Sequence, residues 1–73
     1  MDQSREKTII KDFAQRLKKI RLQRKLSLRQ LADAADMNFG NIHEMEKGNI
    51  NPSLTTVVFL AEALQVEIKD LVK

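Results

Sequence analysis

The sequence predicts an all-α fold, a compact bundle of five helices, from two kinds of observation. Apolar residues recur at steps of three and four along most of the 73-residue chain, which is the spacing of one face of an α-helix. Side chains that cap helix starts stand before three of these stretches, at Ser27, Asn38 and Ser53. The run Thr-Thr-Val-Val-Phe-Leu from residue 55 has strand propensity, but the cap at Ser53 and the helical spacing favour a helix.

The first two helices follow from apolar spacing and from one capping box. The first runs roughly from Ser4 to Lys25, and its inner face is Ile9, Ile10, Phe13, Leu17 and Ile20. Ser27 begins the second helix, because Gln30 follows three residues later and each side chain can bond the other residue's backbone N–H. The second helix turns inward Leu31 and either Ala34 or Ala35.

Three further helices complete the predicted bundle. Asn38 caps the third helix, which runs from Phe39 to about Lys47 and is ended by Gly48. Its inner side is Ile42 and Met45. After a loop at 49–52, Ser53 caps a fourth helix with the inner stripe Leu54, Val57, Val58, Ala61 and Leu64. A short fifth helix is indicated by Ile68, Leu71 and Val72.

Length and composition limit the class of protein. Residues 1–73 are expected to form a single domain, with residues 1–12 as an N-terminal extension of the first helix. A core of this size is marginal alone, so dimerisation would stabilise it. The chain has no cysteine, which excludes disulfides and thiolate metal sites. Because no apolar run is long enough to span a membrane and no signal-peptide pattern is present, we expect a cytoplasmic protein.

The charges are distributed unevenly along the chain, although the net charge is only +3. Residues 13–32 hold seven basic side chains and no acidic one, whereas residues 33–73 hold three bases and seven acids. The seven bases of this basic stretch are Arg16, Lys18, Lys19, Arg21, Arg24, Lys25 and Arg29. The plain interpretation is a solvated helix face, and the alternative is an edge that faces phosphates.

Residues 26–53 place two capped helices on either side of a tight turn, which ends at Asp36-Met37. This spacing sets one short helix across a second one, which can then enter the major groove of DNA.

The pattern resembles the phage-repressor (Cro/Xre-type) helix-turn-helix family over about residues 13–71. The residues that carry the resemblance are Leu26-Ser27, Leu31-Ala32, Ile42, Glu46 with Gly48, Asn51-Pro52-Ser53-Leu54, Val66, Ile68 and Leu71. The resemblance implies a lambda-repressor-like bundle that binds duplex DNA, usually as a two-fold dimer, with its third helix in the major groove. The length is similar to that of restriction-modification controller proteins.

Two groups of residues are expected to contact DNA. Helix starts attract phosphates through free N–H groups, and the start of the second helix follows two basic residues. The expected phosphate contacts are Arg24, Lys25, Ser27, Leu28 and Arg29, with Lys47, Asn49 and Asn51 beyond the third helix. The expected base-reading residues are Phe39, Gly40, Asn41, His43 and Glu44. Among them, Asn41 suits adenine, Glu44 suits cytosine N4, and Phe39 suits a thymine methyl group.

The resemblance also implies an internal ion pair between Arg21 and Glu46 that joins the first helix to the third. Its role would be structural, because it would hold the reading helix against the rest of the bundle. The alternative is two unrelated surface charges.

Three residues depart from the family pattern. The family commonly has glutamine where Leu28 stands, and a polar or basic residue where Phe39 stands. We expect these two either to pack together as an apolar surface for thymine methyls or to enlarge the core. Asp36 replaces the usual turn glycine, so we expect a left-handed backbone there, which Asp tolerates better than most residues.

An exposed aromatic side chain predicts a partner surface. Phe59 points away from the inner stripe of the fourth helix, and an exposed Phe on a small domain suggests an interface. The expected homodimer interface is Phe59, Val66, Ile68 and Val72. Residues 1–12 either pack across the dimer or fray.

The sequence therefore predicts a sequence-specific transcriptional regulator that binds duplex DNA as a dimer, with residues 39–47 in the major groove and half-sites about 10 bp apart. The alternative is a protein-interaction module, such as an antitoxin or docking partner, with weak or no DNA binding. An enzyme is not expected, because His43 is the only histidine and no nucleophile–base pair or metal cluster is evident. No cofactor, metal, membrane partner or small-molecule ligand is expected.

Overall fold

The computed structural model describes residues 3–72, and all of the regular structure in that range is α-helical. The helices are α1 (Gln3–Gln23), α2 (Leu28–Ala35), α3 (Phe39–Glu46), α4 (Leu54–Leu64) and α5 (Ile68–Leu71). This result confirms the predicted bundle of five helices. Of the predicted single domain, residues 1, 2 and 73 lie outside the described range, and residues 3–12 belong to α1.

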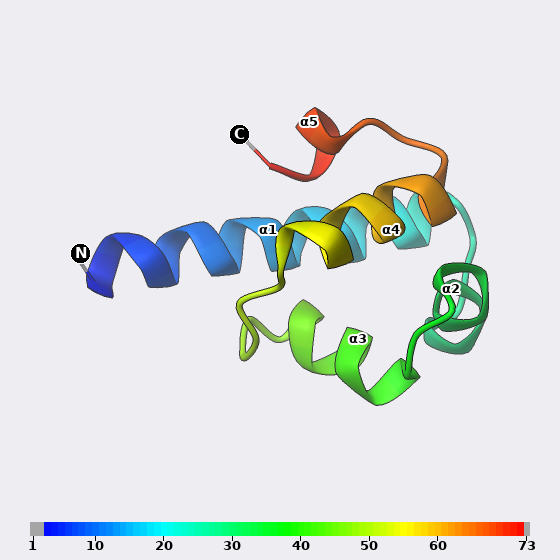
Figure 1. The fold of residues 1–73 in the computed structure, drawn as a ribbon, viewed down its shortest axis with the longest axis horizontal. Coiled ribbons are helices and arrows are strands. Elements are labelled where there is room, and N and C mark those ends of the chain that lie inside the picture. Colours follow the sequence, from blue (N-terminus) through cyan, green and yellow to red (C-terminus); the bar gives the residue numbers. More distant parts are fainter. Residues whose placement is uncertain (1–2, 73) are drawn as a thin grey trace.

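The helices close on one another around a single core. Figure 1 shows α1 as a long rod, with α5 on one side of it and α3 on the other. The main contacts run from α1 to α3, from α3 to α2, from α2 to α4, from α4 to α5, and from α5 back to α1. Every helix therefore has two neighbours, and α3 is supported by α1 and α2.

The core draws fully buried side chains from every helix. These side chains are Leu17, Leu31, Ile42, Leu60, Leu64 and Leu71. They lie with Phe13, Ala32, Ala35, Met45, Val57 and Ala61 in one apolar cluster. Burial of this shared apolar surface is the main force that holds such short helices in place.

For some residues, the prediction of which side chains face inward is wrong. Leu54 is 75% exposed, because it is the first residue of α4 and the buried face begins one turn later at Val57. Leu60, which was left out of the predicted stripe, is fully buried. In α2, Ala35 faces inward and Ala34 does not, and Ile9 on α1 is also exposed.

Three helix ends use left-handed residues other than glycine. Lys25 (φ 59°) follows α1, Asp36 (φ 55°) follows α2, and Gln65 (φ 58°) follows α4. The first helix therefore ends at Gln23, two residues earlier than predicted, because Lys25 turns the chain and its N–H bonds the Leu22 carbonyl at 3.0 Å. The left-handed backbone expected at Asp36 is confirmed.

We expect Asp36→Gly to stabilise the fold by about 0.5 to 1 kcal/mol, because glycine adopts this conformation without strain and a carboxylate is removed from a helix C-terminus. Chemical denaturation followed by circular dichroism measures the change. Asp36→Asn is the matched control, since it removes only the charge and should give a smaller gain. A clear loss of stability in the glycine variant would contradict this account.

Candidate nucleic-acid interface

Helix α3 has one buried side and one open side. Ile42 and Met45 are 0% and 4% exposed and face the core. Phe39, Asn41 and His43 are exposed on the rest of its circumference. Gly40 and Glu44, which complete the expected base-reading set, are half-buried. The helix thus exposes one part of its surface to solvent while Ile42 and Met45 hold the other part in the core.

The start of α3 is capped by a short local hydrogen bond. The Gly40 N–H donates to Asn38 Oδ1 at 2.7 Å, as the predicted cap requires. A Cβ atom on residue 40 would lie 2.9 Å from the same oxygen, so any other residue would displace the capping side chain. The cap at Asn38 therefore favours glycine at position 40, and a glycine could contact DNA only through its backbone.

The end of α3 is closed by Gly48, as predicted. Gly48 has φ 79°, and its N–H donates to the Met45 carbonyl at 3.0 Å. The Asn49 N–H donates to the Glu44 carbonyl at 3.0 Å, which completes a Schellman motif. A Cβ atom on residue 48 would also lie 3.3 Å from Lys11 Cγ of α1. Left-handed backbone and close approach both favour glycine here.

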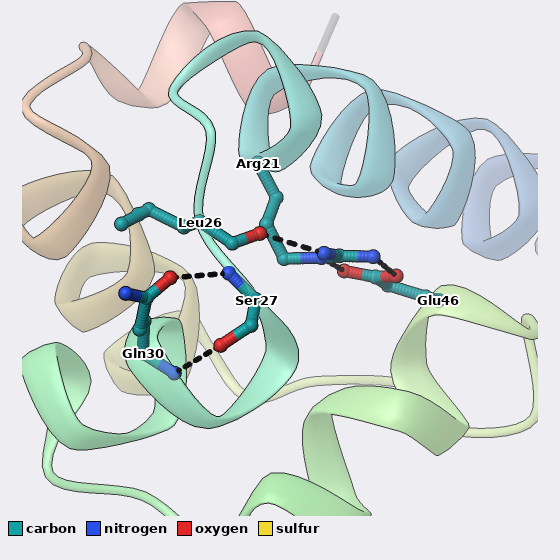
Figure 2. A network of polar contacts seen from close by, with 5 residues as sticks. All are labelled: Arg21, Leu26, Ser27, Gln30 and Glu46. Carbon is teal, nitrogen blue, oxygen red and sulfur yellow. Dashed lines mark hydrogen bonds and ion pairs between the residues drawn. The ribbon is translucent and has the colours of Figure 1, made fainter.

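Helix α2 begins with the predicted capping box, shown in Figure 2. The Gln30 N–H donates to Ser27 Oγ at 3.0 Å, and the Ser27 N–H donates to Gln30 Oε1 at 2.8 Å. Of the neighbouring candidates, Lys25 and Arg29 are exposed. Arg24 is directed elsewhere, because its Nη2 donates to the Gln65 carbonyl at 3.4 Å.

A buried ion pair joins α3 to the end of α1. Arg21 Nε lies 2.7 Å from Glu46 Oε2 and Arg21 Nη2 lies 3.0 Å from Glu46 Oε1, so the contact is bidentate. Arg21 Nη1 also donates to the Leu26 carbonyl at 2.8 Å, as Figure 2 shows. The two side chains are only 9% and 5% exposed. The predicted pair is therefore present, and it ties together α1, α3 and the loop before α2.

A second polar cluster, consisting of Glu44, Lys47 and Asn49, lies on the exposed face at the end of α3. Lys47 Nζ lies 2.8 Å from Glu44 Oε2, and Asn49 Nδ2 donates to Glu44 Oε1 at 3.2 Å. The hydrogen bonds from Lys47 and Asn49 lower the pKa of Glu44 below its ordinary value. One expected base reader and two expected phosphate ligands therefore bind each other. Asn51 lies apart from them and donates to Glu6 Oε1 at 3.5 Å.

Leu28 and Phe39 occupy different environments. Leu28 is half-buried and packs against the core, so for this residue the interpretation as an enlarged core applies. Phe39 is 42% exposed, and the Arg29 guanidinium carbon lies 4.6 Å from the centroid of its ring. Sequence reasoning missed this contact, because it joins residues on two helices and depends on the rotamers of both.

The residues of the expected dimer surface lie on or beside α4 and α5, which contact each other. Phe59 and Ile68 are 49% and 38% exposed, while Val66 and Val72 are half-buried against the core. Leu54, which the sequence placed inside, adds exposed apolar surface on α4. Among residues 3–72, no helix is long and apolar enough to cross a membrane, and no group of three or more acidic, His or Cys side chains is arranged to hold a metal ion.

Comparison with known families decides the class of this chain. Residues 17–71 match the family model described as Helix-turn-helix (HTH_3). The chain belongs to this helix-turn-helix family. The predicted resemblance is thereby confirmed, and the matched range covers the end of α1 through α5.

Two curated relatives of this family are regulators by name. The chain is 38% identical over 58 residues to an immunity repressor protein of Bacillus phage phi105, covering 80% of this chain and 40% of that protein. It is 34% identical over 61 residues to the HTH-type transcriptional regulator DdrOP3 of Deinococcus deserti, covering 84% of this chain and 47% of that protein. The chain thus spans less than half the length of either relative.

Solved structures show the same helix-turn-helix fold. The restriction-modification controller protein C.AhdI of Aeromonas hydrophila matches with a TM-score of 0.83 and 32% identity, covering 85% of this chain and 94% of that one. An HTH_3 family transcriptional regulator from Vibrio cholerae matches with a TM-score of 0.87 and 23% identity, covering 89% of this chain and 36% of that one. At that identity the second match shows the fold alone.

We expect Glu46→Ala to cost about 3 to 5 kcal/mol of unfolding free energy, because it leaves the Arg21 charge buried without its partner. Urea denaturation followed by circular dichroism measures this loss. Asp12→Ala is the control, since it removes a carboxylate from the exposed pair with Arg16 and should change the stability by less than about 0.5 kcal/mol. Equal stability of the Glu46→Ala variant and the wild type would show that the pair does not hold α3.

We expect Lys47→Met to raise the pKa of Glu44 toward its ordinary value, because the hydrogen bond from Lys47 is the largest cause that lowers it. NMR titration of the side-chain carboxyl carbon measures the shift. Asn49→Ala should raise the pKa less, since its hydrogen bond is the second cause. A Glu44 pKa that did not respond to either substitution would show that this cluster does not form in solution.

Proposed function

We propose that this chain is a transcriptional regulator that binds duplex DNA in a sequence-specific manner as a homodimer, with α3 in the major groove. The observation that carries the proposal is that α3 is held firmly in place while part of its surface stays exposed. It is closed at both ends, joined to α1 by a buried ion pair, and open to solvent along Asn41 and His43. A short helix fixed in this way can place side chains against base edges without loss of its own order.

Phosphate contacts would come from the start of α2 and from the end of α3. In the first turn of α2, the Gln30 N–H is used by the Ser27 cap, and the N–H groups of Leu28 and Arg29 are the ones that could bind an anion. Lys25 and Arg29 are exposed beside them. At the other end, Lys47 and Asn49 already bind Glu44, so a phosphate would compete with that carboxylate for them. Such contacts would set the register of the protein on the duplex rather than its sequence preference.

Base reading would rest mainly on Asn41 and His43. Asn41 can form two hydrogen bonds with adenine, and the imidazole of His43 is also exposed on α3. Glu44 can accept from cytosine N4 only with lone pairs that Lys47 and Asn49 leave free. The homodimer would form through Phe59 and Ile68, where apolar side chains are exposed on neighbouring helices.

We expect selection from a random pool of duplexes to recover a two-part site with half-sites about 10 bp apart, because a two-fold dimer presents two reading helices one DNA turn apart. Binding should weaken steeply with salt concentration. Asn41→Ala should relax the preference at one base position and cost about 1 to 3 kcal/mol, whereas Lys25→Ala should weaken all duplexes alike and reduce the salt slope by about 1.

Two other outcomes would change the conclusion. If the selection recovered only a single half-site, the proposal of DNA binding would stand and the proposal of a homodimer would fall. The absence of binding to any duplex, with a folded protein, would overturn the proposal in favour of a protein-interaction module.

A further inference from the structure

Arg29 and Phe39 form a contact between the two helix starts that face the proposed DNA surface. Arg29 is the second residue of α2, and Phe39 is the first residue of α3. The guanidinium carbon of Arg29 lies 4.6 Å from the centroid of the Phe39 ring, within the range of a cation–π contact. Phe39 is 42% exposed, so the pair lies at the surface rather than in the core.

The position of Arg29 is electrostatically unfavourable for the free protein. A cation in the first turn of a helix faces the positive end of the helix dipole. Neither α2 nor α3 has an acidic residue in its first turn. None of the ion pairs formed by residues 3–72 includes Arg29. No ion pair of the described residues therefore accounts for an arginine here, and the face of the Phe39 ring is a contact that offsets part of the cost.

Stacking orients the guanidinium without using its hydrogen-bond donors. The donors of arginine lie in the plane of the group, while a ring below it contacts only the face. The edge of Arg29 remains free to donate two parallel hydrogen bonds. Two acceptors at that spacing occur on a DNA phosphate and on the N7/O6 edge of guanine.

We propose that Arg29 is a bidentate DNA ligand that Phe39 holds in position by stacking, and that Phe39 acts through Arg29 rather than by contact with a thymine methyl. The inference rests on the proposed function, because it assigns roles within the same DNA-binding surface. In place of a direct apolar contact between Phe39 and DNA, it assigns a contact between DNA and the Arg29 guanidinium, which the ring holds in its binding orientation. Preorganisation raises affinity because less side-chain freedom is lost on binding.

The test is a double-mutant cycle with Arg29→Lys and Phe39→Leu, measured as affinity for a duplex selected by the wild type. Leucine keeps an apolar side chain but removes the ring, and lysine keeps the charge but removes the planar donors. We expect Phe39→Leu to weaken binding roughly two- to fivefold when Arg29 is present and by less than about 1.5-fold in the Arg29→Lys background. Phe39→Tyr should retain wild-type affinity, because it keeps the ring.

Two controls separate this effect from changes in the fold. Arg24→Lys alters another arginine of the basic stretch, one that is directed to the Gln65 carbonyl, and its effect should simply multiply with that of Phe39→Leu. In the free protein, the NMR signals of the Arg29 side chain should be shifted by the ring current, and Phe39→Leu should remove the shift. Unfolding midpoints should show that every variant is fully folded under the conditions of the binding assay.

The variant Arg29→Gln shows whether the acceptors for Arg29 belong to a DNA phosphate or to a guanine. If Arg29 binds a phosphate, this variant weakens all duplexes alike and lowers the salt slope by about 1. If it binds guanine, a second selection loses its preference for guanine at one position. Both outcomes support Arg29 as a DNA ligand.

Other outcomes overturn the inference. An equal effect of Phe39→Leu in both backgrounds would show that the ring contacts DNA by itself, and no effect in either would remove both residues from the interface. These results leave the proposed function intact, since the wild type still binds. A wild type that binds no duplex would refute the proposed function, and this inference would fall with it.

Discussion

The orientation of α3 depends on the pair between Arg21 and Glu46. Apolar contacts through Ile42 and Met45 bring this short helix to the core, but they leave its rotation and slide only loosely defined. The bidentate pair and the third bond from Arg21 to the Leu26 carbonyl fix three segments at once. Because all of these donors and acceptors are matched, the two charges are tolerated at low exposure.

A buried pair of this kind contributes little net stability compared with apolar residues of the same size, so its value lies in geometry. We expect an apolar replacement to define the position of α3 less narrowly. The ion pair accepts only one position, since the planar guanidinium matches the carboxylate in a single arrangement. Under the proposed function, the outer residues of α3 would have to meet base edges, and that single arrangement would matter more than additional stability.

Much of the fold was predictable because local signals and apolar spacing agree. Ser27, Asn38 and Ser53 cap the helices that were assigned to them, and Gly48 ends α3. The ends at Lys25 and Gln65 were not predictable in detail, because these residues carry no local preference for a left-handed backbone. Such ends are imposed by the surrounding contacts, which include the bond from Arg24 to the Gln65 carbonyl.

The predictability of the candidate site was more limited than that of the fold. Spacing placed His43 and Glu44 on the side of α3 away from Ile42 and Met45, and the resemblance supplied the ion pair. Neither the spacing nor the resemblance revealed that Glu44 binds Lys47 and Asn49, or that Arg29 stacks on Phe39. These contacts depend on side-chain rotamers and on the close approach of two helices, which periodicity does not encode.

Under the proposed function, affinity and specificity would come from different parts of the surface. The basic stretch in α1 and α2 is rich in positive charge. At the end of α3, by contrast, the charges of Glu44 and Lys47 pair with each other in the cluster that also contains Asn49. Under the proposed function, attraction to the duplex would come mainly from α2 and the loop before it. The net attraction of α3 would be weak, so poor base contacts would not be masked by strong phosphate binding. That division favours discrimination between sequences over tight binding to any DNA.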